Sequence, residues 1–117
     1  MIVMKKTFFY SRRKFTVDVA ETGFFRRGLG LMFRTSGTNN LLFNISSESA
    51  SKLLTAWFVF FPFLVLWIDG SKVADFRFVR PFEAFIDTTK GFSSIIELPL
   101  NKKNFKIVSF FRRRSLR

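Results

Sequence analysis

An uncharged run from Ala56 to Ile68 constrains the fold of this chain more than any other feature, because Pro62 lies in its middle. A transmembrane helix needs about 20 apolar residues to cross about 30 Å of hydrocarbon. The uncharged residues 53–68 would rise only about 24 Å as a helix, at about 1.5 Å per residue. Proline would also interrupt the hydrogen bonds of such a helix, whether in a membrane or in a core. We therefore do not expect a helix here.

Two consecutive buried strands account better for this run, one over residues 56–61 and one over residues 63–68. Pro62 then precedes the second strand, a position at which a missing amide proton is tolerated. Continuous apolar runs, as opposed to alternating ones, are typical of strands that are covered on both faces. The sequence therefore predicts a β-rich core built around Pro62.

Hydrophobic patterning predicts further short strands on both sides of this core. Asp69-Gly70 suits a two-residue hairpin turn, and the partner strand over residues 72–80 alternates Phe76 and Phe78 with charged side chains. Other strands are expected at residues 15–20, 41–45, 92–98 and 105–110. A short helix could begin at Thr22. The predicted fold class is mainly β, a small single-domain β-sandwich or barrel with one short helix.

Cysteine and histidine are both absent from the 117 residues. Their absence excludes disulfides, thiolate nucleophiles and every Ser-His-Asp or Cys-His constellation. No run of acidic and amide residues has the spacing of a calcium loop, so we expect no cofactor and no metal. Glu83 and Asp87 lie four residues apart, and we interpret them as solvated loop charges, not as an acid–base pair. An enzyme is the least favoured class.

The formal charge of +12 is concentrated toward the two ends of the chain. Residues 1–35 carry +6, residues 36–100 carry −1, and residues 101–117 carry +7. We therefore predict a basic N-terminal extension (1–14), a β-rich domain (15–110) and a basic flexible tail (111–117). The chain begins without the pattern of a secretory signal, and with no spanning segment predicted we expect a cytoplasmic protein.

The basic ends suggest binding to a polyanion. If they fold together, they form one positive surface that would bind phosphate backbones in a salt-dependent manner. Phe8, Phe9 and Tyr10 could then stack on unpaired bases. The same mixture could hold the protein to an anionic bilayer surface, or it could serve only to keep mobile ends solvated. The candidate anion- or partner-binding residues are Arg12, Arg13, Lys102, Lys103, Arg112, Arg113 and Arg114.

A second pair of arginines lies seven residues apart, at Arg27 and Arg34. Two guanidinium groups could converge on one anion, because each is a fork-shaped donor for carboxylate or phosphate. We favour the alternative of an internal ion pair with Glu97 or Asp69. Glu97 lies within an apolar strand, so it should face water or be paired, since a lone buried carboxylate is costly.

The order of these motifs resembles that of a known family. Residues 15–20, then Arg27, then Gly30-Leu31-Met32-Phe33-Arg34 are similar to the opening signature of the domain of unknown function family 192, also called uncharacterised protein family 0127. The central run around Pro62 and the Glu97-Leu98-Pro99 segment resemble later elements of that family. The resemblance spans residues 15–100 and implies a mainly β, sandwich-like fold with no established activity.

The chain departs from this family at Thr55, Phe60 and Leu64, where many members carry polar residues. A polar site in that region would therefore be largely lost here. Our first interpretation is a non-enzymatic β-sandwich module that presents a pocket or an edge to an unknown partner. The alternatives are a nucleic-acid-binding accessory protein and, third, a protein that associates with a membrane surface.

Overall fold

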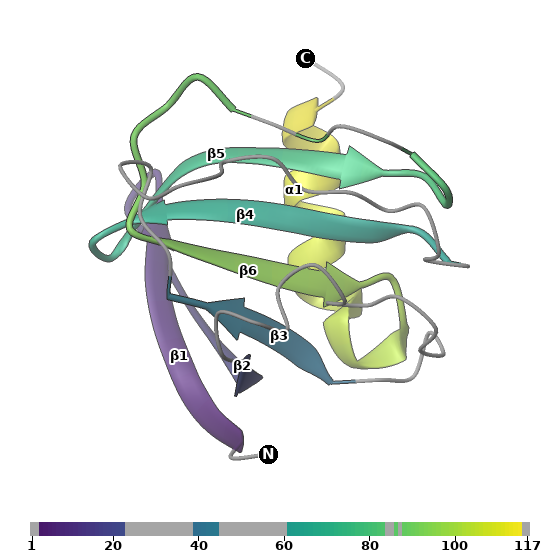
Figure 1. Ribbon diagram of the computed structural model, residues 1–117, viewed down its shortest axis with the longest axis horizontal. Helices are drawn as coiled ribbons and strands as arrows, with labels where there is room; N and C mark the ends of the chain where they lie inside the picture. Colours follow the sequence, from purple (N-terminus) through teal and green to yellow (C-terminus); the bar gives the residue numbers. More distant parts are fainter. Residues whose placement is uncertain (1–2, 23–38, 45–60, 84–85, 87, 116–117) are drawn as a thin grey trace.

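A computed structural model describes residues 3–22, 39–44, 61–83, 86 and 88–115. Six strands close into a barrel with the spatial order β1-β2-β3-β6-β4-β5, and a helix near the C-terminus packs against it (Figure 1). The mainly β fold is confirmed, and of the two predicted architectures the structure has the barrel. The elements are β1 (Val3–Tyr10), β2 (Arg13–Thr22), β3 (Asn40–Phe43), β4 (Phe63–Asp69), β5 (Lys72–Val79), β6 (Ser94–Pro99), the 3-10 turn η2 (Lys102–Asn104) and α1 (Phe105–Ser115).

Strand pairing in the barrel is mixed. β1 and β2 form an antiparallel hairpin, and β4 lies between β5 and β6 with both neighbours antiparallel. β2 pairs with β3 in parallel, and β3 pairs with β6 antiparallel. The barrel closes between β1 and β5 through a single bridge pair, Phe9 with Lys72. There the Phe9 amide donates to the carbonyl oxygen of Ser71 at 2.7 Å.

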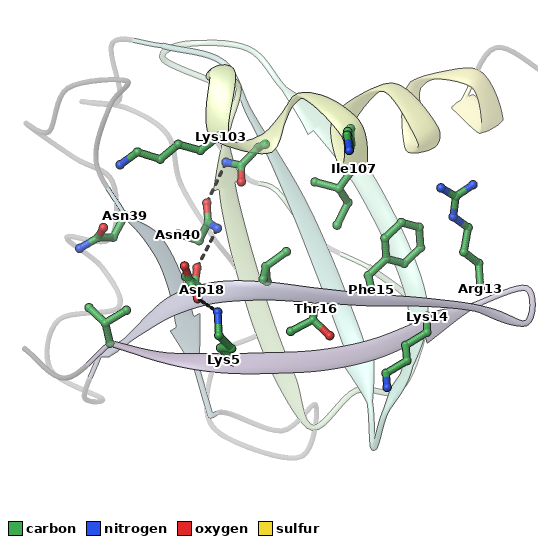
Figure 2. A pocket seen from close by; sticks show the side chains of 14 residues that line it. Lys5, Arg13, Lys14, Phe15, Thr16, Asp18, Asn39, Asn40, Lys103 and Ile107 are labelled. Carbon is green, nitrogen blue, oxygen red and sulfur yellow. Dashed lines mark hydrogen bonds and ion pairs between the residues drawn. The ribbon is translucent and has the colours of Figure 1, made fainter.

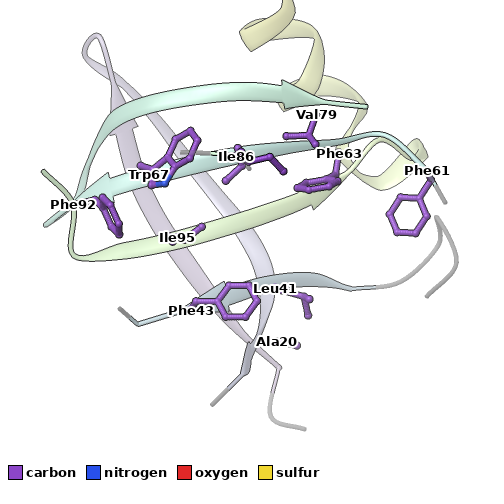
Figure 3. Packing of buried hydrophobic residues seen from close by; sticks show 11 residues of the cluster. Ala20, Leu41, Phe43, Phe61, Phe63, Trp67, Val79, Ile86, Phe92 and Ile95 are labelled. Carbon is purple, nitrogen blue, oxygen red and sulfur yellow. The ribbon is translucent and has the colours of Figure 1, made fainter. Parts of the chain in front are cut away.

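The alternation of side chains along β4 divides the apolar core into two clusters. The inner cluster holds Leu64, Leu66 and Ile68 together with residues of the other strands and of α1. The outer cluster holds Phe63, Val65 and Trp67 together with residues of β2, β3, β5 and β6 and of the connecting segments (Figure 3). All residues of β4 from Phe63 to Ile68 are buried, as the unbroken apolar run predicts. Full burial of each large side chain stabilises the fold by about 1.5–3 kcal/mol.

The central hairpin follows the prediction closely. β4 begins at Phe63, directly after Pro62, and the residues 56–60 of the preceding predicted strand lie outside the described part of the chain. The last pair of the ladder is Asp69 with Lys72, so the turn residues are Gly70 and Ser71, one position later than predicted. Gly70 has a φ of 66°, which glycine adopts without steric cost.

Residues 3–10 form β1 of the barrel and residues 13–14 begin β2, so the described part of residues 1–14 is not the extension that was predicted. β1 pairs with β2 along its whole length, from Val3 with Ala20 to Tyr10 with Arg13. Phe8 is fully buried in the inner cluster, whereas Lys5 is exposed. Charged residues fit this strand because one of its faces meets solvent.

Residues 105–115 form α1, whereas a strand over residues 105–110 and a flexible tail over residues 111–117 were predicted; residues 116–117 lie outside the described part of the chain. Ile107, Phe110 and Phe111 recur at helical spacing and are buried in the inner cluster. Aromatic and β-branched residues favour strands intrinsically, but burial of one helical face overrides that preference. The arginines of the last turn suit the negative end of the helix dipole. The helix predicted to start at Thr22 lies outside the described residues, and Thr22 itself ends β2.

Candidate functional site

A groove of about 600 Å³ lies between the β1–β2 hairpin and the start of α1 (Figure 2). Asp18 is the one carboxylate among the described residues that line it. Asn39, Asn40, Phe15 and Ile107 contribute polar and apolar surface. The basic residues of this lining, which we call the basic groove, are Lys5, Arg13, Lys14, Lys103 and Lys106. A phosphate-rich ligand would therefore find positive charge along the whole groove.

The fold creates this groove by placing the two ends of the chain side by side. Arg13 and Lys14 begin β2, while Lys106 belongs to α1. In Figure 2, Arg13 lies at one end of the groove and Lys103 at the other, with Phe15 and Ile107 between them. The two basic segments, far apart in the sequence, thus contribute to one surface.

A chain of amide hydrogen bonds fixes the junction between β2, β3 and η2 beneath the groove. The buried side chain of Asn104 donates from Nδ2 to Asn40 Oδ1 at 2.8 Å and to the Pro99 carbonyl oxygen at 2.7 Å. Asn40 in turn donates from its Nδ2 to the carbonyl oxygen of Asp18 at 2.8 Å. The sequence analysis did not single out Asn40 and Asn104, because the hydrogen bond between them joins positions 64 residues apart.

One ion pair lies at the edge of the groove. Lys5 Nζ is 2.9 Å from Asp18 Oδ1, and both side chains are largely exposed. Solvent screening makes such a pair worth little to stability. The ion pair instead changes the local charge of the groove, because the Asp18 carboxylate neutralises part of the positive charge that an anionic ligand would meet.

Three arginine side chains, of which Arg13 lines the groove, lie over aromatic rings. Arg13 Cζ is 5.5 Å from the ring centroid of Phe15 and 4.9 Å from that of Phe110. Arg114 Cζ is 4.1 Å from the Phe110 centroid. In the same way Arg112 lies 4.7 Å from the ring of Phe78. Such contacts contribute about 0.5–1 kcal/mol at exposed sites and restrict where the guanidinium groups point.

The remaining candidates from the sequence lie elsewhere. Arg12 occupies the β1–β2 turn, and Arg113 is exposed on α1. Lys102 and Arg112 line a second, shallower groove beside Phe105 and Val108. Arg27 and Arg34 fall outside the described residues.

The expectation that three N-terminal rings stack on bases is wrong for two of them. Phe8 is fully buried. Tyr10 packs edge-on against Phe76 and Phe110, with centroids 5.9 Å apart in each pair. Phe9 alone of the three is exposed, to 38%. The basic groove can therefore offer charge and hydrogen-bond donors, but few ring faces.

Glu97 is neither solvated nor paired within the described part of the chain. It lies on β6 between Leu41 of β3 and Val65 of β4 and is only 4% exposed. Its Oε1 has no hydrogen-bond partner among the described residues. Burial raises the pKa of Glu97 to about 8, because an apolar environment disfavours the charged form. Asp69, by contrast, is exposed at the end of β4.

The described residues contain few groups suited to catalysis. Glu83 forms an ion pair with Arg77, so it is not simply a solvated loop charge, and residue 87 lies outside the described ranges. No group of three or more acidic side chains within the described part of the chain could hold a metal ion. None of the helices described is long and apolar enough to span a membrane.

Comparison with known proteins supports the barrel fold. No family model matches the chain, and no curated protein does. A crystal structure from Sinorhizobium meliloti 1021, described as a "putative transcription regulator", matches with a TM-score of 0.69 and 19% sequence identity. The match covers 88% of this chain and 83% of the other. At this identity the likeness extends to the fold.

Proposed function

We propose that this protein is a small non-enzymatic binding module whose basic groove binds nucleic acid through the phosphate backbone. The observation that carries the proposal is the gathering of five Lys and Arg side chains along one groove, where the part of the lining that the structure describes holds a single carboxylate. Neutralising phosphates with these cations releases condensed counterions, which favours binding. The likeness to a protein described as a transcription regulator supports a nucleic-acid context.

The lining of the groove also indicates the mode of binding. Lysines supply most of its charge, and the neighbouring rings of Phe8 and Tyr10 are packed into the core. Phosphate contacts position a protein on nucleic acid but carry no sequence information directly. We therefore expect binding with little sequence preference and with strong salt dependence.

A salt series tests the proposal. Fluorescence anisotropy would follow binding of a labelled mixed-sequence oligonucleotide to the wild type and to the K14Q/K106Q variant, which loses one groove cation from each end of the chain. The matched control is K90Q, because Lys90 is exposed and does not line the groove. Removal of each phosphate contact should reduce the slope of log K against log salt by about 1.

The double variant should therefore lose both affinity and about two units of slope, whereas K90Q should behave like the wild type. Equal binding by all three proteins would overturn the groove as the site. Preferential binding of the wild type to anionic vesicles over the oligonucleotide would instead favour the membrane-surface alternative.

A further inference from the structure

We propose that Arg13 and Arg114, both held against the ring of Phe110, form a seat for one phosphate group at the end of the basic groove. Their Cζ atoms lie 4.9 Å and 4.1 Å from the same ring centroid. Because both distances end at the same centroid, the separation between the two Cζ atoms cannot exceed their sum. Phe110 itself is only 3% exposed, so the ring that orients both cations is fixed in the core.

The rigid packing around Phe110 makes this arrangement preorganised. Its ring also contacts Phe15 and Phe111, with centroids 4.9 Å and 5.2 Å away. Arg13 comes from β2 and Arg114 from the last turn of α1, so the seat exists only when both elements are docked. Preorganised donors lose less conformational entropy when they bind a ligand.

Neither guanidinium is paired with an acid in the described part of the chain, where the two ion pairs join Lys5 to Asp18 and Arg77 to Glu83. Two like charges near one ring repel each other, and a shared anion would relieve that repulsion. The Cζ atom of each guanidinium lies over the Phe110 ring. The N–H groups around the edge of each guanidinium stay available as donors.

Phosphate suits these donors, because the planar fork of guanidinium binds two oxygens of a phosphate at once. Arg13 is the one arginine among the groove cations, and the other four are lysines, which act as point charges. The seat would therefore hold one phosphate in a defined orientation, while the lysines attract the rest of the strand. This inference rests on the proposed function in taking a nucleic-acid backbone as the source of the phosphate.

Arginine-to-lysine substitutions test the seat, because they keep the charge and remove the fork. The variants are R13K, R114K and the double variant, and the matched control is R113K, since Arg113 is exposed on the same turn of α1. Charge-assisted hydrogen bonds contribute about 1.5–3 kcal/mol, so R13K and R114K should each weaken oligonucleotide binding by about tenfold or more. The double variant should lose less than the product of the two single losses, because both arginines serve one phosphate.

A second measurement uses inorganic phosphate as the probe at constant ionic strength. Phosphate should raise the Tm of the wild type and of R113K above the value in chloride, and it should not do so for R13K or R114K. It should also shift the NMR signals of the Arg13 and Arg114 side-chain N–H groups.

The outcomes separate the seat from the proposed function. If R13K and R114K bound the oligonucleotide as tightly as R113K does, the phosphate seat would be overturned. The basic groove would still stand as the proposed binding site. A phosphate effect that depends on both arginines, in a protein that binds no oligonucleotide, would support the seat as a site for free phosphate and overturn the nucleic-acid function. Absence of both effects in the wild type would overturn both proposals.

Discussion

The side chain of Asn104 donates a hydrogen bond to Asn40 Oδ1 at 2.8 Å, although the two residues are 64 positions apart in the sequence. This contact, with the one from Asn104 to the Pro99 carbonyl oxygen, ties the turn before α1 to the barrel. It thereby sets the position of the helix that carries Lys106 and Arg114. The geometry of the basic groove depends on this buried amide.

Substitution N104A should therefore destabilise the fold. It leaves the acceptors on Asn40 and Pro99 without their donor, and unsatisfied buried groups cost about 1–3 kcal/mol each. We expect the free energy of unfolding in urea to fall by about 2 kcal/mol. N39A is the control, because Asn39 is the exposed neighbour in the same segment. An equal effect of N104A and N39A would contradict this role.

The buried carboxyl of Glu97 should make the stability of the protein depend on pH. Burial raises the pKa of Glu97 from 4.5 to about 8. As pH rises, the Glu97 carboxyl therefore loses its proton at a lower pH in the unfolded chain than in the folded protein. The unfolded state then binds fewer protons than the folded state, and stability falls with rising pH over this window. The slope should be about 1.4 kcal/mol per pH unit between pH 4.5 and about pH 8.

Unfolding titrations at several pH values check this expectation. E97Q should flatten the dependence and should be more stable than the wild type above about pH 8. E83Q provides the comparison, because it removes a carboxylate that is paired with Arg77 and not one buried without a partner. The role assigned to Glu97 fails if E97Q and the wild type show the same slope.

Substitution D18N should strengthen binding of the oligonucleotide. It removes the one carboxylate that the described residues contribute to the groove, and it frees Lys5 from its ion pair. A unit charge at about 4 Å in water contributes about 1 kcal/mol, which corresponds to a gain of about fivefold at low salt. The amide network is preserved, because Asn40 binds the backbone carbonyl of Asp18 and not its side chain.

The matched control for D18N is D69N, which removes the same charge at the exposed end of β4. Anisotropy titrations at low and high salt should show a gain for D18N that diminishes as salt screens the charges. If D69N produced the same gain, net charge alone would explain binding, and the location of Asp18 would be irrelevant.

The β1–β2 turn offers a prediction about stability alone. Ser11 and Arg12 have φ values of 51° and 72°, a region in which a side chain is strained and glycine is not. Two-residue hairpin turns with positive φ at both positions favour glycine at the second. Relief of the left-handed conformation, about 1–2 kcal/mol, exceeds the entropy cost of glycine in the unfolded chain, so R12G should raise the free energy of unfolding by about 0.5–1 kcal/mol. The control K14G lies within β2, where glycine should destabilise the strand, and a loss of stability in R12G would contradict the strain.

The central hairpin could be predicted because its signals are local. Pro62, the unbroken apolar run after it and the alternation around Phe76 and Phe78 depend on neighbouring residues, and β4 and β5 follow them. α1 could not be predicted in this way, because the composition of residues 105–111 favours a strand and the helix depends on burial against the barrel.

The candidate site could be predicted only in part, because it too depends on contacts between residues that are distant in the sequence. The excess of charge at the two ends can be counted, but the contact of Arg13 with Phe110 joins residues that only the complete fold brings together. The lysines of residues 5 and 6 suggested an N-terminal extension. These residues instead belong to a strand, in which the alternation of side chains buries Phe8. The resemblance to domain of unknown function family 192 stays a prediction, since no family model matches the chain.

The most direct test of the basic groove is a map of the amide NMR signals that shift when the wild type is titrated with an unlabelled oligonucleotide. The groove account predicts shifts for residues 13–18 of β2 and for residues 103–107, which span the end of η2 and the start of α1. Signals of the second groove, around Val108 and Ser109, should change less. Shifts confined to other surfaces, or no shifts at low salt, would contradict the account.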